Sequence, residues 1–200
     1  MPRERGAHTG ALEVARMPLT APELITAPRL QLHRLARADL AGLLAVNGDP
    51  QVTQYLPYKA WTTLADAEAW YQRMENLQRD GGAIQWVIAR SDTLLAIGTC
   101  LLFRYEQSSQ CAELGYVLGR EYWGQGWMSE ALNAAIDWIF TSTPLRRLEA
   151  YVDGRNAASC RLLRRIGFVP EGTLRERWQV DTALADANIF GLLRREWHRT

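Results

Sequence analysis

The hydrophobic pattern changes its period near residue 120, and this change limits the folds that the chain can adopt. Three apolar runs of strand length come first: "AIQWVIAR", "LLAIGTCLLFRY" and "CAELGYVLG". The short polar breaks "SDT" and "EQSSQ" separate them, which is typical of antiparallel hairpins. Between residues 127 and 140 the apolar residues then recur at helical spacing, at Met128, Ala131, Leu132, Ala135, Trp138 and Ile139. Hairpin strands followed by an amphipathic helix predict a sheet with helices packed on it.

The segments on either side complete the expected fold. "RLQLHRL" alternates like a strand, and two helical patterns follow in "ARADLAGLLAVNGD" and "TLADAEAWYQRMENLQRDGG", the second with Thr63 and Asp66 as its capping pair. After the long helix, "RRLEAYVDG" predicts a strand, "NAASCRLLRRIGF" a short helix, and "TLRERWQV" and "ANIFGLLRREW" two closing strands. This order predicts an α/β (α+β) fold with a mixed sheet and helices on both faces.

No repeat or linker divides residues 21–200, which we expect to form a single domain, whereas residues 1–20 are polar, lack a period and are interpreted as a flexible tail. The net charge of +1 gives no support for generic nucleic-acid binding. The three cysteines lack CxxC spacing and the three histidines lie far apart, so we expect no metal site. Without an apolar run of signal-peptide or membrane-span length, the chain is predicted to be cytoplasmic, with no membrane partner.

Two glycines, Gly124 and Gly126, stand directly before the long helix, in "REYWGQGWMSEAL". The start of a helix offers unpaired N–H groups and a partial positive charge, and glycines let an anion such as a pyrophosphate approach them. A Walker loop is excluded because no Gly-Lys-Ser/Thr follows, and the third glycine of a dinucleotide fingerprint is missing. The spacing alone leaves two readings open: a phosphate cradle, or a glycine turn that binds nothing.

The stretch "AELGYVLGREYWGQGWMSEAL" resembles the acetyl-coenzyme A signature of the GNAT family of N-acetyltransferases, and most closely its RimJ/RimL branch. "TAPRLQLHRLARADL", "NAASCRLLRRIGF" and "LLRREW" are similar to other motifs of that branch in the same order, so the resemblance covers about residues 24–198. It implies a mostly antiparallel sheet of about seven strands in which the fourth strand splays from the fifth and leaves a cleft.

The resemblance also implies how acetyl-coenzyme A is held. The pantetheine arm would lie in the cleft and pair with the backbone near Tyr116, Val117 and Leu118. The pyrophosphate would bind amides of the loop and the helix start, at Trp123, Gly124, Gln125, Gly126, Trp127, Met128 and Ser129.

Asn156 and Ser159 begin the short helix. From the residues alone, Asn156 is a good N-cap and Ser159 needs no chemistry. The resemblance gives both a further role: Asn156 would hold the pantetheine or a water molecule, and Ser159 would also contact the cofactor and protonate the departing thiolate.

Acetyl transfer also needs a base, because only a neutral amine attacks a thioester. Glu113 is the first candidate, since a carboxylate inside the apolar strand "CAELGYVL" is costly without a partner or a purpose. Glu176, in "LRERW" on a late strand, is the second. An ordinary paired or solvent-facing glutamate remains the alternative for Glu113.

Two weaker patterns concern the two ends of the expected cleft. Arg161, Arg164 and Arg165 could meet the 3′-phosphate of the cofactor, or could form an exposed helical face. The aromatic residues Tyr55, Tyr58 and Trp61 could line the acceptor side, or could simply pack.

The predicted function is transfer of acetyl from acetyl-coenzyme A to a primary amine, either a protein N-terminus or a small molecule, by direct attack in a ternary complex without a metal. The alternative is a non-catalytic acyl-coenzyme A-binding sensor or partner protein of the same fold. Self-association into a homodimer, through a sheet edge or the late strands, is left open.

Overall fold

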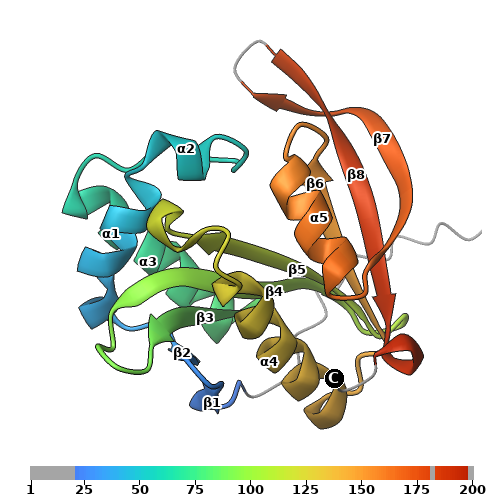
Figure 1. Ribbon diagram of the computed structural model, residues 1–200, viewed down its shortest axis with the longest axis horizontal. Helices are drawn as coiled ribbons and strands as arrows, with labels where there is room; N and C mark the ends of the chain where they lie inside the picture. Colours follow the sequence, from blue (N-terminus) through green and yellow to red (C-terminus); the bar gives the residue numbers. More distant parts are fainter. Residues whose placement is uncertain (1–20, 181–182, 198–200) are drawn as a thin grey trace, which may run out of the picture.

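The computed structural model describes residues 21–180 and 183–197 (Figure 1). Within them, eight strands form one sheet in the order β1-β2-β3-β4-β5-β6-β8-β7. In chain order the strands are β1 (Leu24–Thr26), β2 (Leu30–Arg34), β3 (Ala83–Arg90), β4 (Ala96–Glu106), β5 (Cys111–Leu118), β6 (Arg147–Asp153), β7 (Val169–Val180) and β8 (Ala183–Leu193). The pair β5–β6 is parallel and the other pairs of these described strands are antiparallel.

Helices cover both faces of the sheet, as predicted (Figure 1). The helices α1 (Leu40–Asn47) and α3 (Leu64–Arg79) pack against β4 and β3, with the short α2 (Pro50–Thr53) beside α1. The long α4 (Trp127–Ser142) packs against β1, β2 and β4, and α5 (Ala157–Arg165) lies on β7. Three short 3-10 helices, η1 (Arg37–Asp39), η2 (Arg120–Tyr122) and η3 (Arg194–Glu196), complete the described elements.

Alternation along the strands divides the core between the two faces. In β3, the buried side chains of Trp86 and Ile88 pack with the residues of α4, whereas Val87 packs with those of α1 and α3. Because successive side chains of a strand point to opposite faces, a strand covered on both sides is apolar throughout. This explains why "AIQWVIAR" is a continuous apolar run.

The two strands of the parallel pair separate after a short stretch of contact. Pairing between β5 and β6 runs from Cys111↔Arg147 through Ala112↔Leu148 to Glu113↔Glu149 and then stops. Residues 114–118 and 150–153 therefore belong to strands that no longer pair with each other, while β5 keeps its ladder with β4 up to Leu118↔Gly98. The predicted separation of these strands is confirmed.

Several predicted boundaries are wrong. The sheet has an eighth strand, since Leu24–Thr26 pairs with β2 as an antiparallel edge strand. The sequence did not predict the short helix Pro50–Thr53, which is capped by the Asp49 side chain. The first predicted helix is divided into η1 and α1. The closing strand ends at Leu193, since "RRE" turns into η3, where the Arg194 guanidinium binds the carbonyl oxygen of Leu145. The capping pair Thr63–Asp66 is confirmed.

No helix in the described part of the chain is long and apolar enough to cross a lipid bilayer. The described residues also contain no group of three or more His, Cys, Asp or Glu side chains that could hold a metal ion.

Leu132, which is fully buried on α4, tests the main core. Leu132→Ala should lower the free energy of unfolding by about 2–5 kcal/mol, because it removes a buried side chain and leaves a cavity. Leu64→Ala is the matched control, since Leu64 is 56% exposed at the start of α3 and should change the same quantity by less than about 0.5 kcal/mol. Urea denaturation of both variants measures the difference, and equal losses would contradict this account of the core.

Candidate functional site

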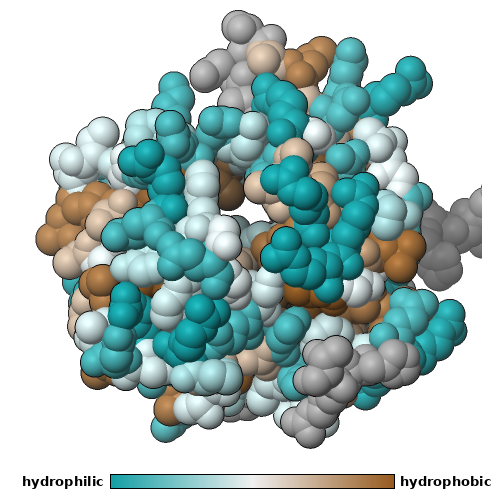
Figure 2. All heavy atoms as spheres, viewed as in Figure 1, coloured by the Kyte–Doolittle hydropathy of each residue, from teal (hydrophilic) through white to brown (hydrophobic). Residues whose placement is uncertain are grey.

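A cavity of about 510 Å³ lies where β5 and β6 separate. In Figure 1 it falls between α2 and α5, and the space-filling view of Figure 2 is hollowed in the same place. Four segments of the chain line it: α2 with the loop that follows, the end of β5, the loop leading into α4, and α5. The lining residues are Gln51, Val52, Gln54, Tyr55, Leu56, Tyr116, Val117, Leu118, Tyr122, Trp123, Gly124, Gly126, Trp127, Met128, Ser129, Asn156, Ala158, Ser159, Arg161, Leu162 and Arg165.

The N-terminus of α4 opens into this cavity without a side-chain cap. Gly126 is its N-cap residue, with φ of 83°, and it has no side chain to accept a hydrogen bond from the backbone N–H groups of the first turn. Trp127, Met128 and Ser129 form that turn and line the cavity. An uncapped helix start carries unpaired N–H groups and a partial positive charge, so this turn can bind an anion.

Gly124 keeps the approach to this helix start open. Its φ is 73°, a left-handed value that favours glycine, and a Cβ atom built on it would meet no protein atom within 4 Å. A side chain here would thus project into unfilled space at the cavity, where a ligand would lie. The two glycines of the sequence motif therefore leave the approach to the helix start free of side chains, as the predicted phosphate cradle requires.

Arg29, which precedes β2, contacts both the glycine loop and the first turn of α4. Its guanidinium Nε donates to Glu130 Oε2 at 2.6 Å and its backbone N–H donates to Glu130 Oε1 at 2.7 Å, in the first turn of α4. The guanidinium also lies 4.3 Å from the centroid of the Trp127 ring and donates to the carbonyl of Gln125 at 3.3 Å. These contacts hold the helix start against the edge of the sheet.

Gln125 and Trp123 tie the loop to its own backbone. The Gln125 amide donates to the carbonyl of Glu121 at 2.7 Å, and the Trp123 indole donates to the carbonyl of Leu118 at 2.8 Å. Gln125 does not line the cavity, unlike the other residues predicted to bind the cofactor. Its side chain acts on the shape of the loop.

Ser159 lies at the cavity and shares a short hydrogen bond with Tyr116. The distance between the two hydroxyl oxygens is 2.6 Å. Asn156 caps α5, since its side-chain oxygen accepts from the backbone N–H of Ser159 at 3.0 Å, as predicted. Burial raises the pKa of the Tyr116 phenol, against the opposing effect of the Ser159 hydrogen bond, so this phenol stays protonated at neutral pH.

Glu113 stands at the last rung where β5 and β6 still pair, opposite Glu149. Its side chain is 12% exposed, and its Oε2 accepts from Arg104 Nη1 at 2.7 Å. Burial raises the pKa of the Glu113 carboxyl above its usual range, while the charge and hydrogen bond of Arg104 oppose that rise. Glu113 does not itself line the cavity; it lies next to the point where the cavity begins.

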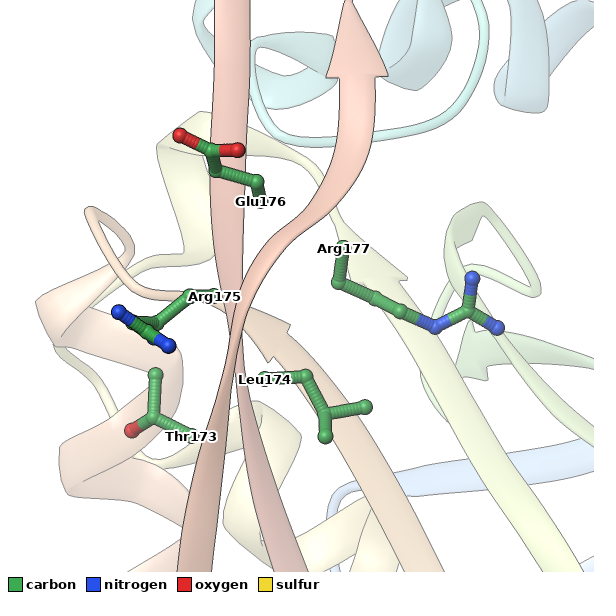
Figure 3. Close-up of a pocket in the computed structure, with 5 residues that line it drawn as sticks. All are labelled: Thr173, Leu174, Arg175, Glu176 and Arg177. Atoms are coloured by element: carbon green, nitrogen blue, oxygen red, sulfur yellow. The ribbon is translucent and has the colours of Figure 1, made fainter.

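Glu176, the second candidate base, lies on another surface. It is exposed, has a φ of 51°, and sits in an irregular stretch of β7 between Leu174 and Trp178. The open hollow beside it is lined by five consecutive residues of β7 alone, Thr173, Leu174, Arg175, Glu176 and Arg177 (Figure 3). Among the described residues no second element lines that hollow, and Glu176 is not among the residues that line the cavity with Ser159 and the glycine loop.

Comparison with known proteins agrees with this geometry. Residues 29–169 match the family model of the acetyltransferase (GNAT) domain. This chain belongs to the GNAT family of acetyltransferases.

Among the relatives of this N-acetyltransferase is the uncharacterized N-acetyltransferase p20 of Bacillus licheniformis, 36% identical over 88% of this chain and 98% of that protein. The ribosomal-protein-serine acetyltransferase of Escherichia coli is 33% identical over 57% of this chain and 63% of its own length. The crystal structure of Vibrio cholerae spermidine N-acetyltransferase, in complex with CoA and spermine, has a TM-score of 0.73 at 23% identity, covering 84% of this chain and 96% of that one. This last likeness shows the shared fold.

The residues of the weaker sequence patterns line the cavity only in part. Arg161 and Arg165 line the cavity of this acetyltransferase, whereas the Arg164 guanidinium lies 5.4 Å from the centroid of the Phe190 ring. Tyr55 also lines it. Tyr58 and Trp61 instead stack on each other, with ring centroids 6.2 Å apart, so they pack.

Sequence reasoning missed several residues of the site. Arg29 binds Glu130, 101 residues away, and the Tyr116 hydroxyl binds Ser159, 43 residues away. No local sequence pattern predicts contacts over such distances along the chain. Gln51 and Gln54 line the cavity from the unpredicted helix α2 and the residue after it. The Asp-Pro pair at Asp49 and Pro50 was the available signal, because Asp before Pro is typical of a helix start.

The contact between Arg104 and Glu113 gives a test of the electrostatics. Arg104→Gln should raise the pKa of Glu113 further, because it removes the guanidinium whose charge and hydrogen bond oppose the effect of burial. At a fixed pH near that pKa, the deprotonated fraction of Glu113 should therefore fall. Carbon-13 NMR titration of the glutamate carboxyls measures the shift. Arg79→Gln, on the exposed end of α3, is the control and should leave Glu113 unchanged; a fixed or lower pKa in Arg104→Gln contradicts the assignment.

Proposed function

We propose that this N-acetyltransferase transfers acetyl from acetyl-coenzyme A to a primary amine by direct attack, with both substrates bound at the cavity between β5 and β6. The observation that carries the proposal is the uncapped start of α4 behind Gly124 and Gly126, facing this cavity. Supporting it, the related Vibrio cholerae enzyme was crystallised with CoA. Acetyl-coenzyme A supplies the acetyl group as a thioester, which a neutral amine can attack.

The chain offers distinct groups to the two ends of the cofactor. The backbone N–H groups of Trp127, Met128 and Ser129 would bind the pyrophosphate. The edge of β5 that β6 has left, at residues 116–118, would pair with the amides of the pantetheine arm. Arg161 and Arg165 lie on the same cavity wall and could meet the 3′-phosphate.

Glu113 is the proposed base. Its raised pKa makes the carboxylate a better proton acceptor, and its place at the last rung puts it beside the opening between the strands. It would remove a proton from the attacking ammonium, through water, since it does not line the cavity directly. Glu176 is the weaker proposal, because it lies on the exposed stretch of β7.

Ser159 is the proposed acid for the departing thiolate. The Ser159 hydroxyl would donate its proton to the sulfur as the C–S bond breaks and would regain a proton from solvent when the thiol leaves; its short hydrogen bond to the Tyr116 phenol, which stays protonated, would orient it toward the sulfur. Asn156 fixes the backbone of Ser159 and so orients the hydroxyl. Cys160 is buried beside Ser159, and the proposed direct attack gives it no covalent role.

The wider setting stays a prediction. The RimJ/RimL-like assignment is supported by the Escherichia coli relative, whose name gives a ribosomal-protein serine as its acceptor. We expect a cytoplasmic enzyme and leave homodimerisation open, with oligomeric state to be measured by light scattering.

Gly124→Val tests the cradle. The substitution should raise the acetyl-coenzyme A Kd at least about tenfold, because a branched side chain is strained at a left-handed φ and fills the approach to α4. Gly172→Val is the control: a Cβ there also meets nothing within 4 Å, but Gly172 lies on β7 outside the cavity. Isothermal calorimetry gives both constants, and equal affinity in the two variants would refute the cradle.

Ser159→Ala tests the acid. The variant should lower kcat by about 10²-fold while leaving the acetyl-coenzyme A Kd within about twofold, because the hydroxyl acts on the leaving group. Tyr116→Phe should show a smaller loss of the same kind, and Ser108→Ala, in the β4–β5 turn, should show none. Thiol release is the assay. Saturable acetyl-coenzyme A binding without thiol release from any amine would instead identify a non-catalytic binding module.

A further inference from the structure

We propose that the acceptor of this enzyme carries a single positive charge, on the amino group that reacts, and that the rest of the molecule next to this group is neutral. This inference rests on the proposed function and names the class of amine. It separates monoamines, including peptide N-termini with neutral side chains, from polyamines and aminoglycosides.

The wall opposite α5 offers no carboxylate to a second ammonium group. It consists of α2 and the adjoining loop, and the side chains that line the cavity there are Gln51, Val52, Gln54, Tyr55 and Leu56. Among all the described residues that line the cavity, the charged ones are Arg161 and Arg165, and both are positive. Both are proposed to meet the 3′-phosphate of the cofactor, so a second ammonium group on the α2 wall would find no carboxylate among the side chains that line the cavity there.

Three carboxylates near the cavity, Asp49, Asp153 and Glu113, are already paired with arginines. Asp49 accepts from Arg120 Nε at 2.7 Å and from the backbone N–H of Gln51 at 2.8 Å. Asp153 is buried and accepts from both the guanidinium and the backbone of Arg155. Glu113 is paired with Arg104.

Recruiting one of these carboxylates to a second ammonium would break an existing ion pair. The lost pair would leave an arginine unpaired, so the exchange brings little net gain. Because these carboxylates are paired, they offer little negative charge to a polycation in the cavity.

The mouth of the cavity carries the ion pair of Arg155 with Asp153, of which the arginine is the exposed member. The guanidinium of Arg155 lies 5.9 Å from the centroid of the Tyr55 ring, and its side chain is 53% exposed. It thus stands over the acceptor side of the cavity, at the start of α5. A distal ammonium that extended from the cavity toward solvent on this side would pass near it.

The same wall does fit a neutral substituent. Val52 is buried, and Tyr55 and Leu56 are partly buried, so they offer apolar surface. Gln51 and Gln54 are exposed amides, each able to donate and to accept hydrogen bonds, as a peptide group or a hydroxyl requires. The wall therefore matches an acceptor with one reactive charge, an apolar part and neutral polar groups.

A matched pair of amines tests this inference directly. Hexylamine and 1,6-diaminohexane have the same chain length and differ by one ammonium group. We expect kcat/KM for hexylamine to exceed that for the diamine by at least about tenfold, because the second charge is desolvated without a partner. A diamine that is used as well as or better than hexylamine overturns the inference.

Gln54→Glu should shift this preference toward the diamine. A carboxylate at this exposed position of the wall can pair with the second ammonium, so the hexylamine-to-diamine ratio should fall by about threefold or more. Gln72→Glu adds the same charge on the exposed face of α3 and should leave the ratio unchanged. Equal ratios in the two variants would contradict the assignment of the wall.

Binding of 1,6-diaminohexane to the CoA-loaded protein, followed by calorimetry, supplies a readout that does not need turnover. We expect no saturable binding to the native chain at micromolar concentrations and a gain in the Gln54→Glu variant. Tight binding to the native chain overturns the inference even if no amine is acetylated. Failure of the proposed function is distinguished by a different result, namely acetyl-coenzyme A binding without thiol release from any amine, peptide N-termini included.

Discussion

The backbone hydrogen-bond ladder between β5 and β6 ends at Glu113 and Glu149, and the candidate site depends on this ending. Beyond that rung, peptide groups on one edge of β5 have lost their strand partner, and buried peptide groups need a partner. A cavity that passes between two strands of one sheet can therefore bind a ligand through the backbone itself. Side chains of both sheet faces also meet at this opening, with Tyr116 and Ser159 on one wall and the α2 segment on another.

Positive groups dominate this opening, and they come from the backbone as well as from arginines. The uncapped turn of α4 offers N–H groups, and Arg161 and Arg165 of α5 line the cavity. Three nearby carboxylates, Glu113, Asp49 and Asp153, are paired with arginines. One electrostatic arrangement thus accounts both for the proposed attraction of a phosphorylated cofactor and for the proposed rejection of a polycationic acceptor.

Local signals in the sequence predicted the parts of the site that depend on neighbours in the chain. Gly124 and Gly126 before an amphipathic stretch predicted an open helix start, and both glycines have positive φ. Asn156 predicted the N-cap of the short helix. Contacts across the sheet could not be predicted in this way: Arg29 reaches Glu130 over 101 residues. Glu176 illustrates a third case, because an irregular register in β7 breaks the simple alternation from which the direction of a strand side chain is inferred.

The parallel direction of β5 and β6 has a consequence for where such a site can arise. Two parallel neighbours cannot be joined by a tight turn, so the chain must cross over the sheet, and here α4 makes the crossover. A crossover helix necessarily starts at the carboxyl end of the strand it leaves. In this protein β5 and β6 separate at the carboxyl end of β5. The connectivity therefore places the start of α4 next to the unpaired backbone of β5. The proposed anion-binding geometry thus follows from the topology, and the side chains have only to leave the helix start unobstructed.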